Sequence, residues 1–377
     1  MTAAPRIVVL GATGYTGDLT ARSLVRQGAR PVLVGRNPAR LAALAADLGG
    51  LDTATVDIEK PTTLRAVLHE GDILISAVGP FLKYGRTAVE AAAEIGVHYF
   101  DSAGEGPFIR EVFERWGPVA ERNGAGLVPA FGYDYGPGAY AAAAALDEAG
   151  DEATAVDIAY FAPGFVPSGG SQATAVRVVV EEGYAFREGR IQAERPGRWT
   201  RRFTVDGRPL LGASVPAAEQ FGLPQTYPGL RDVTVFLGLP RGAARSLAIS
   251  SRLLGPVLHM GALKRGLTAI ADRMMTGSTG GPDAHSRAQA RSAVVAVARS
   301  PHRELARVTL AGPDPYEVTA DLLAWGARTA VQDGLHGVGA LGPVKAFGVD
   351  GLERACTTAS LIRGQCPRSS GTRPAHR

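Results

Sequence analysis

The sequence predicts an α/β protein in which a doubly wound parallel sheet comes first and a second α+β domain, built on a mixed or antiparallel sheet, follows. Three observations support this prediction. Up to residue 135, apolar runs of strand length alternate with segments of helical periodicity. Short links join them, as in sheets built from repeated strand–helix–strand units. Beyond Gly136, strand-like runs follow one another with few helices between them, which is typical of an α+β domain.

Each element of the first half has its own local signal. The strand expected at 7–10 is a continuous apolar run, and the helix expected at 16–28 has Gly28 as its C-cap. The helix expected at 37–50 begins with Asn37 as N-cap and Pro38 in its first turn. The other expected strands are 31–35, 53–57, 72–79, 97–104 and 126–132, and the other expected helices are 61–70, 86–96 and 107–124.

The second half has strand patterns with fewer helices. An alanine-rich helix is expected at 139–150, a helix at 172–183 interrupts the strands, and a long helix is expected at 317–334. The expected strands are 154–162, 185–194, 198–207, 232–238 and 303–312. We therefore expect one domain at 1–135, a second domain at 136–363 and a disordered polar tail at 364–377. As an alternative, the C-terminal helices of the second domain pack back on the first domain.

The composition is that of a globular protein with ample apolar material. The chain has 377 residues, of which 45% are hydrophobic and 20% charged, and this length is typical of two domains. The formal net charge of +4 indicates either a solvated surface or a preference for anionic ligands such as phosphates. The basic residues are scattered and no basic-aromatic platform recurs, which argues against nucleic acid as a partner.

Cysteine usage and hydropathy indicate a cytoplasmic protein. The two cysteines, Cys356 and Cys366, form no metal-ligand spacing, so we expect a reducing compartment and no metal. The start of the chain reads directly into a strand and has no signal-peptide pattern. The most apolar stretch, 246–265, is interrupted by Arg252 and Pro256. We expect it to be a packed or interfacial helix pair, and contact with a membrane surface is the less favoured alternative.

Three glycines, Gly11, Gly14 and Gly17, separate the first expected strand from the first expected helix, within residues 10–17 (LGATGYTG). Such a turn forms an anion site, because the N–H groups at a helix N-terminus are unpaired and the helix dipole adds positive charge. We expect Gly11 to allow the tight turn, Gly14 the approach of a phosphate and Gly17 close helix packing. The spacing differs from GxGxxG, so the strand before and the helix after support this interpretation; the alternative is a structural turn.

The residue after the second expected strand indicates which dinucleotide binds. Domains that bind NAD usually have Asp or Glu there, bonded to the ribose 2′-OH, whereas this chain has Arg36. Because a guanidinium pairs with a 2′-phosphate, NADP is favoured over NAD, with Arg40 one helical turn further on. The alternative is that Arg36 is a solvated surface residue. Asp57, after the third expected strand, is expected either at the adenine edge or as a cap of the next turn.

Polar side chains follow several expected strands at the edge where ligands bind in such sheets. Small residues at 76–79 leave room for a cofactor over the strand ends. Asp134 and Tyr135 are the favoured proton donors of the site, and Tyr133 and Lys83 are further candidates. Asp134 has an alternative role as the N-cap of the following helix, and Lys83 as a surface residue.

Several of these segments together resemble the saccharopine dehydrogenase/reductase-like family. They are 10–17 (LGATGYTG), 78–85 (VGPFLKYG), 98–105 (HYFDSAGE) and 130–138 (AFGYDYGPG), with looser similarity at 168–175 (SGGSQATA) and 334–348 (GLHGVGALGPVKAFG). The resemblance implies a Rossmann domain that binds NADP, a second domain for substrate and dimer contacts, and hydride transfer between them. The cofactor-binding residues that it implies, together with those at the strand ends, are Gly11, Ala12, Thr13, Gly14, Tyr15, Thr16, Gly17, Arg36, Asp57, Ser76, Ala77, Val78, Gly79, Asp101 and Ser102.

The chain departs from the family pattern at residues 132–137 (GYDYGP), where members commonly have Gly-Phe-Asp-Ser-x-Pro. Tyr135 then stands where a small residue is usual and would narrow the pocket. No spacing selects a pair of arginines to anchor the two carboxylates of an amino-acid substrate such as saccharopine. The family includes trans-acting enoyl reductases of polyketide or lipid chains, and the first-domain pattern is similar to theirs.

We therefore expect an NADPH-dependent reductase that transfers a hydride to a C=N or an activated C=C bond of a biosynthetic intermediate. One alternative is a trans-acting enoyl reductase that works on carrier-bound chains, and another is a non-catalytic NADPH-binding scaffold or sensor. The expected partners are a small-molecule or carrier-bound substrate and a second copy of the chain in a homodimer.

Overall fold

A parallel sheet of seven strands forms the N-terminal part of the molecule, in the order β15-β6-β5-β4-β1-β2-β3. The computed structural model describes residues 4–169, 182–238 and 280–364. The strands of this sheet are β1 (Ile7–Leu10), β2 (Val32–Gly35), β3 (Thr53–Thr55), β4 (Ile73–Ser76), β5 (His98–Asp101), β6 (Gly126–Val128) and β15 (Gly339–Ala340). The predicted doubly wound sheet is confirmed. The chain runs in opposite directions across the sheet from β1 and from β4, and such a point is where ligands bind.

The helices of this part follow the predicted alternation, with two local differences. They are α1 (Tyr15–Arg26), α2 (Pro38–Asp47), α3 (Pro61–Arg65), α4 (Arg86–Ile95), α5 (Gly106–Glu111) and α6 (Gly117–Arg122). The side chain of Asn37 accepts the Arg40 N–H at 3.0 Å, which confirms it as the N-cap of α2. The single helix expected at 107–124 is interrupted by a π-helical turn, η2 (Val112–Trp116). A second π-helical turn, η1 (Phe81–Gly85), precedes α4.

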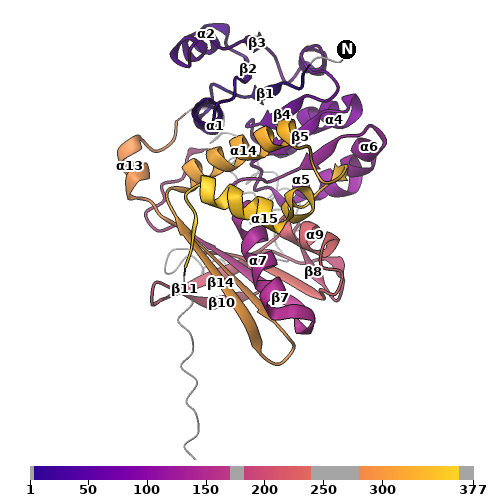
Figure 1. Cartoon of the computed structure of the whole chain (residues 1–377), viewed down its shortest axis with the longest axis vertical. Helices are drawn as coiled ribbons and strands as arrows, with labels where there is room; N and C mark the ends of the chain where they lie inside the picture. Colours follow the sequence, from indigo (N-terminus) through magenta and orange to yellow (C-terminus); the bar gives the residue numbers. More distant parts are fainter. Residues whose placement is uncertain (1–3, 170–181, 239–279, 365–377) are drawn as a thin grey trace, which may run out of the picture.

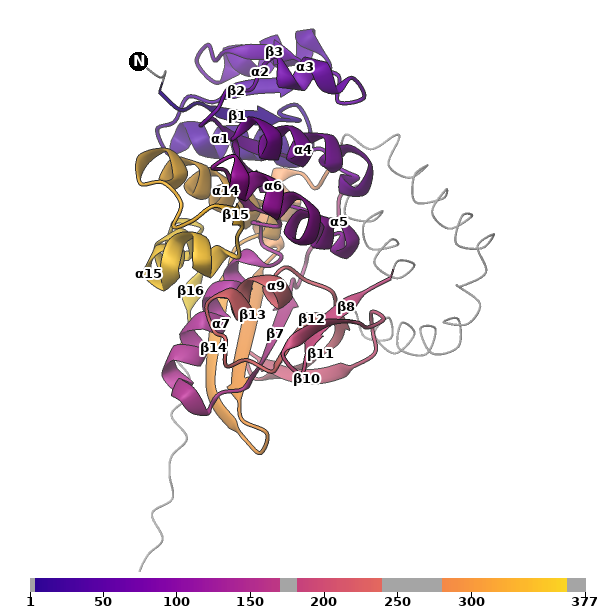
Figure 2. The same ribbon diagram turned by 90° about the vertical axis from the view of Figure 1, so that its right-hand side faces the viewer.

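The second sheet has nine strands, with the main order β10-β11-β12-β7-β13-β14-β16 and the hairpin β8–β9 beside β12. Its strands are β7 (Ala155–Phe161), β8 (Tyr184–Arg187), β9 (Arg190–Ala193), β10 (Thr200–Val205), β11 (Arg208–Val215), β12 (Asp232–Gly238), β13 (Ser292–Arg299), β14 (Glu304–Gly312) and β16 (Ile362–Arg363). The β7–β12 pair is parallel and β7 is antiparallel to β13. The predicted mixed sheet is confirmed, and it lies below the first sheet in Figure 2.

Two expectations about the strands of this half need correction. The single strand expected at 185–194 is a hairpin, because Glu188 and Gly189 both have positive φ, 51° and 80°, and reverse the chain. Strands β11 and β13 were not expected. Most of β13 is buried, so it lacks the alternation of a strand with one solvated face.

The C-terminal part of the chain returns to the first sheet. The long helix α14 (Pro315–Gln332) packs against α1 and lies over β4 and β5, and β15 pairs with β6. Helix α15 (Pro343–Thr358) lies between α14 and α7 (Gly136–Ala149), as Figure 1 shows. Helix α7 is almost entirely buried because it covers β13 and β14 of the second sheet. The second half also contains the short helices α9 (Glu219–Gly222) and α13 (Ala284–Gln289).

Some expectations fall outside the described residues. They are the helix at 172–183 apart from its end, the apolar stretch 246–265 and the tail beyond Gly364. Within the described residues, no helix combines the length and the hydropathy that crossing a membrane requires.

Candidate functional site

The turn between β1 and α1 has the backbone shape of a phosphate-binding loop. Gly11 has φ 82°, a left-handed conformation that favours glycine. The N–H groups of Gly11 and Ala12 donate to the Val34 carbonyl at 2.8 and 3.1 Å, which ties the loop to β2. A Cβ on Gly17 would lie 2.1 Å from the Gly11 carbonyl oxygen, so only glycine allows α1 to approach the loop this closely.

The N-terminus of α1 is open to an anion. Gly14 is the N-cap and supplies no side chain to bond the first N–H groups of the helix. A Cβ built on Gly14 would meet only the Gly11 carbonyl oxygen, at 3.2 Å, and its other side is open space among the described residues. The loop therefore fits a pyrophosphate held by backbone N–H groups and the helix dipole. Thr13 and Thr16 are both partly exposed beside it.

The side chain of Tyr15 contacts α14 and the segment before α13. Its ring lies edge-on to Tyr316, with centroids 4.9 Å apart, and its hydroxyl donates to the Pro282 carbonyl at 2.7 Å. Arg287 donates to the same hydroxyl at 3.2 Å. Tyr15 thus joins the loop to the segment before α13.

Two cations, Arg36 and Arg40, follow β2 near the glycine turn. Arg36 follows β2, is exposed, and pairs with none of the described residues. The Arg40 guanidinium donates to the Thr13 carbonyl at 3.5 Å and so lies between α2 and the glycine turn. Asp57 is half-buried two residues beyond β3, accepts the Glu59 N–H at 3.2 Å and lies 3.8 Å from Lys60. Its carboxylate caps the following turn, which is one of the two roles expected for it.

The residues expected along the cofactor differ in accessibility. Ala77 and Val78 are half-buried and Gly79 is exposed, and a Cβ on Gly11 would lie 2.6 Å from Val78 Cγ2. Ser76 and Asp101, by contrast, are fully buried.

The Asp101 carboxylate supports two loops from within the protein. Its Oδ1 accepts the N–H groups of Ala103 and Ala130 at 2.8 and 2.7 Å, so it fixes the chain after β5 and after β6. Burial raises the pKa of Asp101 to about 6. Ser102, the next residue, is half-buried and lines the cavity described next.

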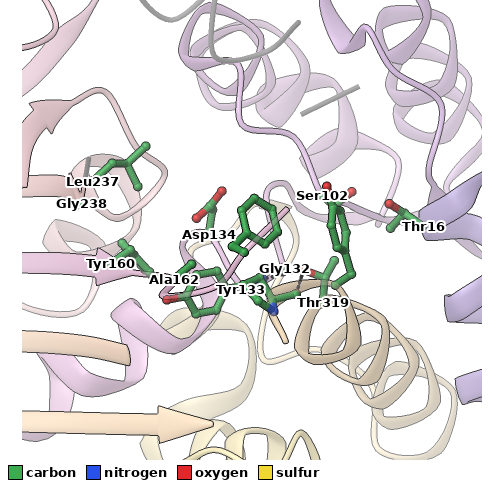
Figure 3. Close-up of a pocket in the computed structure, with 13 residues that line it drawn as sticks. Thr16, Ser102, Gly132, Tyr133, Asp134, Tyr160, Ala162, Leu237, Gly238 and Thr319 are labelled. Atoms are coloured by element: carbon green, nitrogen blue, oxygen red, sulfur yellow. Dashed lines mark hydrogen bonds between the residues drawn. The ribbon is translucent and has the colours of Figure 1, made fainter. Parts of the chain in front are cut away.

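A cavity of about 270 Å³ lies beside the glycine turn and reaches into the second domain (Figure 3). Its described lining residues are Thr16, Ser102, Gly132, Tyr133, Asp134, Tyr160, Ala162, Phe165, Leu237, Gly238, Pro315, Tyr316 and Thr319. They come from α1, from the ends of β5, β7 and β12, from the loop before α7, and from α14. The cavity therefore connects the cofactor loop with the second sheet.

Asp134 is the only carboxylate among the described residues that line the cavity. Its side chain is open to the cavity space, while the surrounding protein displaces bulk water and raises its pKa to about 6. The expected alternative role as N-cap is wrong, because α7 begins after Tyr135 and no side chain caps it. Tyr135 has φ 89°, a conformation rare for residues with a side chain.

The other candidate proton donors are placed differently. Tyr133 lines the cavity, but its hydroxyl is buried. This hydroxyl shares its hydrogen bond between the Phe161 carbonyl at 2.9 Å and the Ala293 carbonyl at 3.2 Å. The Tyr135 hydroxyl donates to the Pro216 carbonyl at 3.3 Å. Lys83 donates to the Tyr84 hydroxyl at 2.8 Å, lies 3.4 Å from Glu59 and is not a lining residue. Of the four candidate proton donors, Asp134 is therefore the one whose polar group is available in the cavity.

Several lining residues were not expected from the sequence. Thr319 accepts the Tyr133 N–H at 2.9 Å and donates to the Pro315 carbonyl at 2.8 Å, so α14 supports the Asp134 loop. Tyr316 stacks at a tilt on Phe165, with centroids 5.2 Å apart. For these lining residues on α14, the sequence offers one local signal, Asp314, whose side chain caps the start of the helix. A cap predicts where a helix begins and does not indicate that α14 reaches the first sheet.

Fold and site together define a two-domain protein with a dinucleotide-binding domain whose phosphate loop opens on an interdomain cavity. Residues 7–126 match the family described as the saccharopine dehydrogenase NADP binding domain. The first domain is therefore an NADP-binding domain of the saccharopine dehydrogenase type, and the predicted resemblance and cofactor are confirmed.

The chain is also similar to curated relatives in sequence and to a solved structure in fold. The chain is 36% identical over 134 residues to trans-acting enoyl reductases of Mycobacterium ulcerans and Mycobacterium tuberculosis, covering 34% of this chain and 32% of each relative. The aligned part thus spans about a third of the length of these relatives. Saccharopine dehydrogenase (L-Glu forming) from Saccharomyces cerevisiae has a similar fold, with a TM-score of 0.58 over 96% of this chain and 99% of that one. Its sequence is 12% identical, so this likeness concerns the fold alone.

Proposed function

We propose that the chain is an NADPH-dependent reductase that transfers a hydride to an activated C=C bond of an apolar, carrier-delivered chain. The character of the cavity carries this proposal. No lysine or arginine occurs among its described lining residues, and the walls beyond Asp134 include Ala162, Phe165, Leu237 and Pro315. The names of the mycobacterial relatives, which are trans-acting enoyl reductases, support the same bond type.

The charge of the cavity favours one of the two bond types that the sequence left open. An imine formed from amino acids has carboxylates, and each buried carboxylate needs a cation or several hydrogen bonds to offset its desolvation. In the described lining the only ionised group at neutral pH is Asp134, which would repel such a substrate. An uncharged acyl chain meets no such penalty and gains from burial against the apolar wall.

The chain's own residues have separate roles in this proposal. Bound NADPH supplies the hydride. The N–H groups at the start of α1 hold its pyrophosphate, and Arg36 holds its 2′-phosphate. The cavity walls exclude water and orient the acyl chain. Reduction of a C=C bond also consumes one proton. With a pKa of about 6, a minor fraction of Asp134 is protonated at neutral pH, and this form delivers the proton from a carboxyl oxygen.

The test is NADPH consumption by the purified protein with uncharged enoyl thioesters of pantetheine and with imines of dicarboxylic amino acids. We expect turnover with the enoyl thioesters alone. Asp134→Asn should lower it by roughly 100-fold or more, as expected for loss of a general acid. Asp147→Asn removes a carboxylate outside the described cavity lining and should leave the rate unchanged. Turnover of the imines alone, or full activity of Asp134→Asn, contradicts the proposal.

Partners and location stay predictions. A carrier protein that delivers the acyl chain, a homodimer and a cytoplasmic location are all consistent with the proposed reaction. NADPH binding without consumption of either substrate class would favour a scaffold or sensor instead.

A further inference from the structure

Glu219, the first residue of α9, is a carboxyl group enclosed behind the cavity wall. Its side chain is fully buried. Tyr160 donates a hydrogen bond to its Oε1 at 2.6 Å, and its Oε2 has no partner among the described residues. None of the described lysines or arginines forms an ion pair with it. Burial raises its pKa to about 8, so the group is neutral at pH 7. A buried carboxyl without a cation costs stability and is more typical of a functional site than of a core.

Tyr160 connects Glu219 with the turn that bears Asp134. Besides donating to Glu219, the Tyr160 hydroxyl accepts the Tyr135 N–H at 3.1 Å. Tyr160 lines the cavity, and its ring lies edge-on to the rings of Tyr133 and Tyr135, with centroids 5.6 and 6.1 Å apart. These two tyrosines flank Asp134 in the sequence. One side chain therefore contacts both neighbours of the cavity carboxylate.

The absence of a side chain at Gly138 leaves space for the Tyr160 hydroxyl. A Cβ on Gly138 would lie 1.8 Å from that hydroxyl and 2.8 Å from Glu219 Oε1, so glycine is required in the first turn of α7. Tyr135 has the left-handed φ of 89°, which persists in a folded protein when its surroundings hold it. The bond from its N–H to Tyr160 is such a restraint, and the orientation of Asp134 depends on this turn.

We propose that Glu219 is a positioning residue that acts through Tyr160 to hold the turn 133–135 so that the Asp134 carboxyl group faces the cavity. Glu219 is not itself a lining residue of the cavity, and it touches neither cofactor nor substrate in this role. The inference rests on the proposed function only in one respect, which is that Asp134 delivers a proton to the substrate.

The test follows the ionisation of Asp134 itself in the full chain. Carbon-13 NMR of labelled aspartate carboxyl groups gives its titration curve, and Asp134→Asn assigns the signal. Among the described residues, the titratable groups that interact electrostatically with Asp134 are Tyr133, Tyr135, Tyr160 and Glu219. In Glu219→Leu and Tyr160→Phe, we expect the Asp134 pKa to fall toward the ordinary aspartate value by roughly one unit, a tenfold change in proton affinity. Glu219→Gln, whose amide oxygen still accepts from Tyr160, should keep the wild-type curve.

Activity gives a second readout. The kcat of enoyl reduction should fall about tenfold or more in Glu219→Leu and Tyr160→Phe, with KM nearly unchanged and Glu219→Gln close to wild type. Tyr227→Phe is the matched control, because Tyr227 also bonds a carboxylate, Asp147 at 2.9 Å, but does not line the cavity.

The outcomes separate the inference from the proposed function. An unchanged Asp134 titration in Tyr160→Phe, or a changed one in Glu219→Gln, overturns the positioning role. Tyr160→Phe keeps the ring and its packing, so it remains informative if Glu219→Leu fails to fold. A shifted titration together with no turnover of any substrate supports the positioning role and contradicts the proposed reaction, because the NMR readout needs neither substrate nor cofactor.

Discussion

Replacing Glu219 by Gln should stabilise the protein, by an amount that grows as the pH rises toward 8. The folded protein holds the Glu219 proton up to a pKa of about 8, whereas an ordinary glutamate releases it near 4.5. Between these values the unfolded chain is ionised and the folded chain is not. The protonated Glu219 therefore makes its full contribution to the free energy of unfolding below pH 4.5. This contribution is lost as the pH rises through 8.

The size of the effect follows from the same interval. The difference between the two pKa values corresponds to roughly 5 kcal/mol in the free energy of unfolding once the pH reaches 8. Gln keeps the bond from Tyr160 and does not titrate. Glu219→Gln should thus resemble wild type near pH 4.5 and be more stable by roughly that amount at pH 8.

Denaturant unfolding at several pH values, followed by tryptophan fluorescence, measures this difference. Glu152→Gln is the control, since Glu152 is an exposed partner of Arg303, and its effect should stay within about 0.5 kcal/mol at every pH. A stability difference for Glu219→Gln that is the same at both ends of the pH range would show that the buried carboxyl is not held protonated.

Four further predictions concern the cofactor loop and its surroundings. Arg36→Ala should weaken NADPH binding by roughly tenfold or more and leave NADH binding unchanged, since a charge-assisted hydrogen bond is worth about 1.5–3 kcal/mol; nicotinamide fluorescence titration measures both, and equal losses would refute the 2′-phosphate contact. Gly17→Ala should abolish NADPH binding and lower the melting temperature, because the new Cβ would meet the Gly11 carbonyl at 2.1 Å. Gly14→Ala should weaken NADPH binding while its melting temperature stays near wild type, so a large thermal loss would contradict an open phosphate space. Asn37→Ala should lower the free energy of unfolding by about 1 kcal/mol through loss of the α2 cap, and no change would mean that the bond to Arg40 adds nothing.

The first sheet could be predicted because each of its strands is a short buried apolar run bounded by clear signals. The run 7–10 leads into the glycine turn, and Asn37 caps α2 as expected. The residues expected to bind the phosphates are local in sequence, so their spacing describes the site without tertiary information. Arg36 and the glycines therefore fall where a dinucleotide-binding domain needs them.

The cavity could not be predicted, because its walls come from distant parts of the chain. Thr319 and Tyr316 lie on α14, whose helical pattern gives no sign that it packs against α1. The orientation of Asp134 depends on the left-handed backbone of Tyr135, a position where a side chain normally disfavours that conformation. Glu219 has an ordinary surface-residue signature in sequence, and only the packing of Tyr160 beneath α7 shows that it is buried.

The most direct measurement of the central claim is isotope transfer from the cofactor. The protein is incubated with NADPH that carries deuterium at the transferable position and with an uncharged enoyl thioester of pantetheine, and the product is analysed by mass spectrometry and NMR. We expect one deuterium at the β-carbon and a solvent proton at the α-carbon, with little product from Asp134→Asn. Oxidation of NADPH without deuterium in the product, or transfer only to an imine, would contradict this claim.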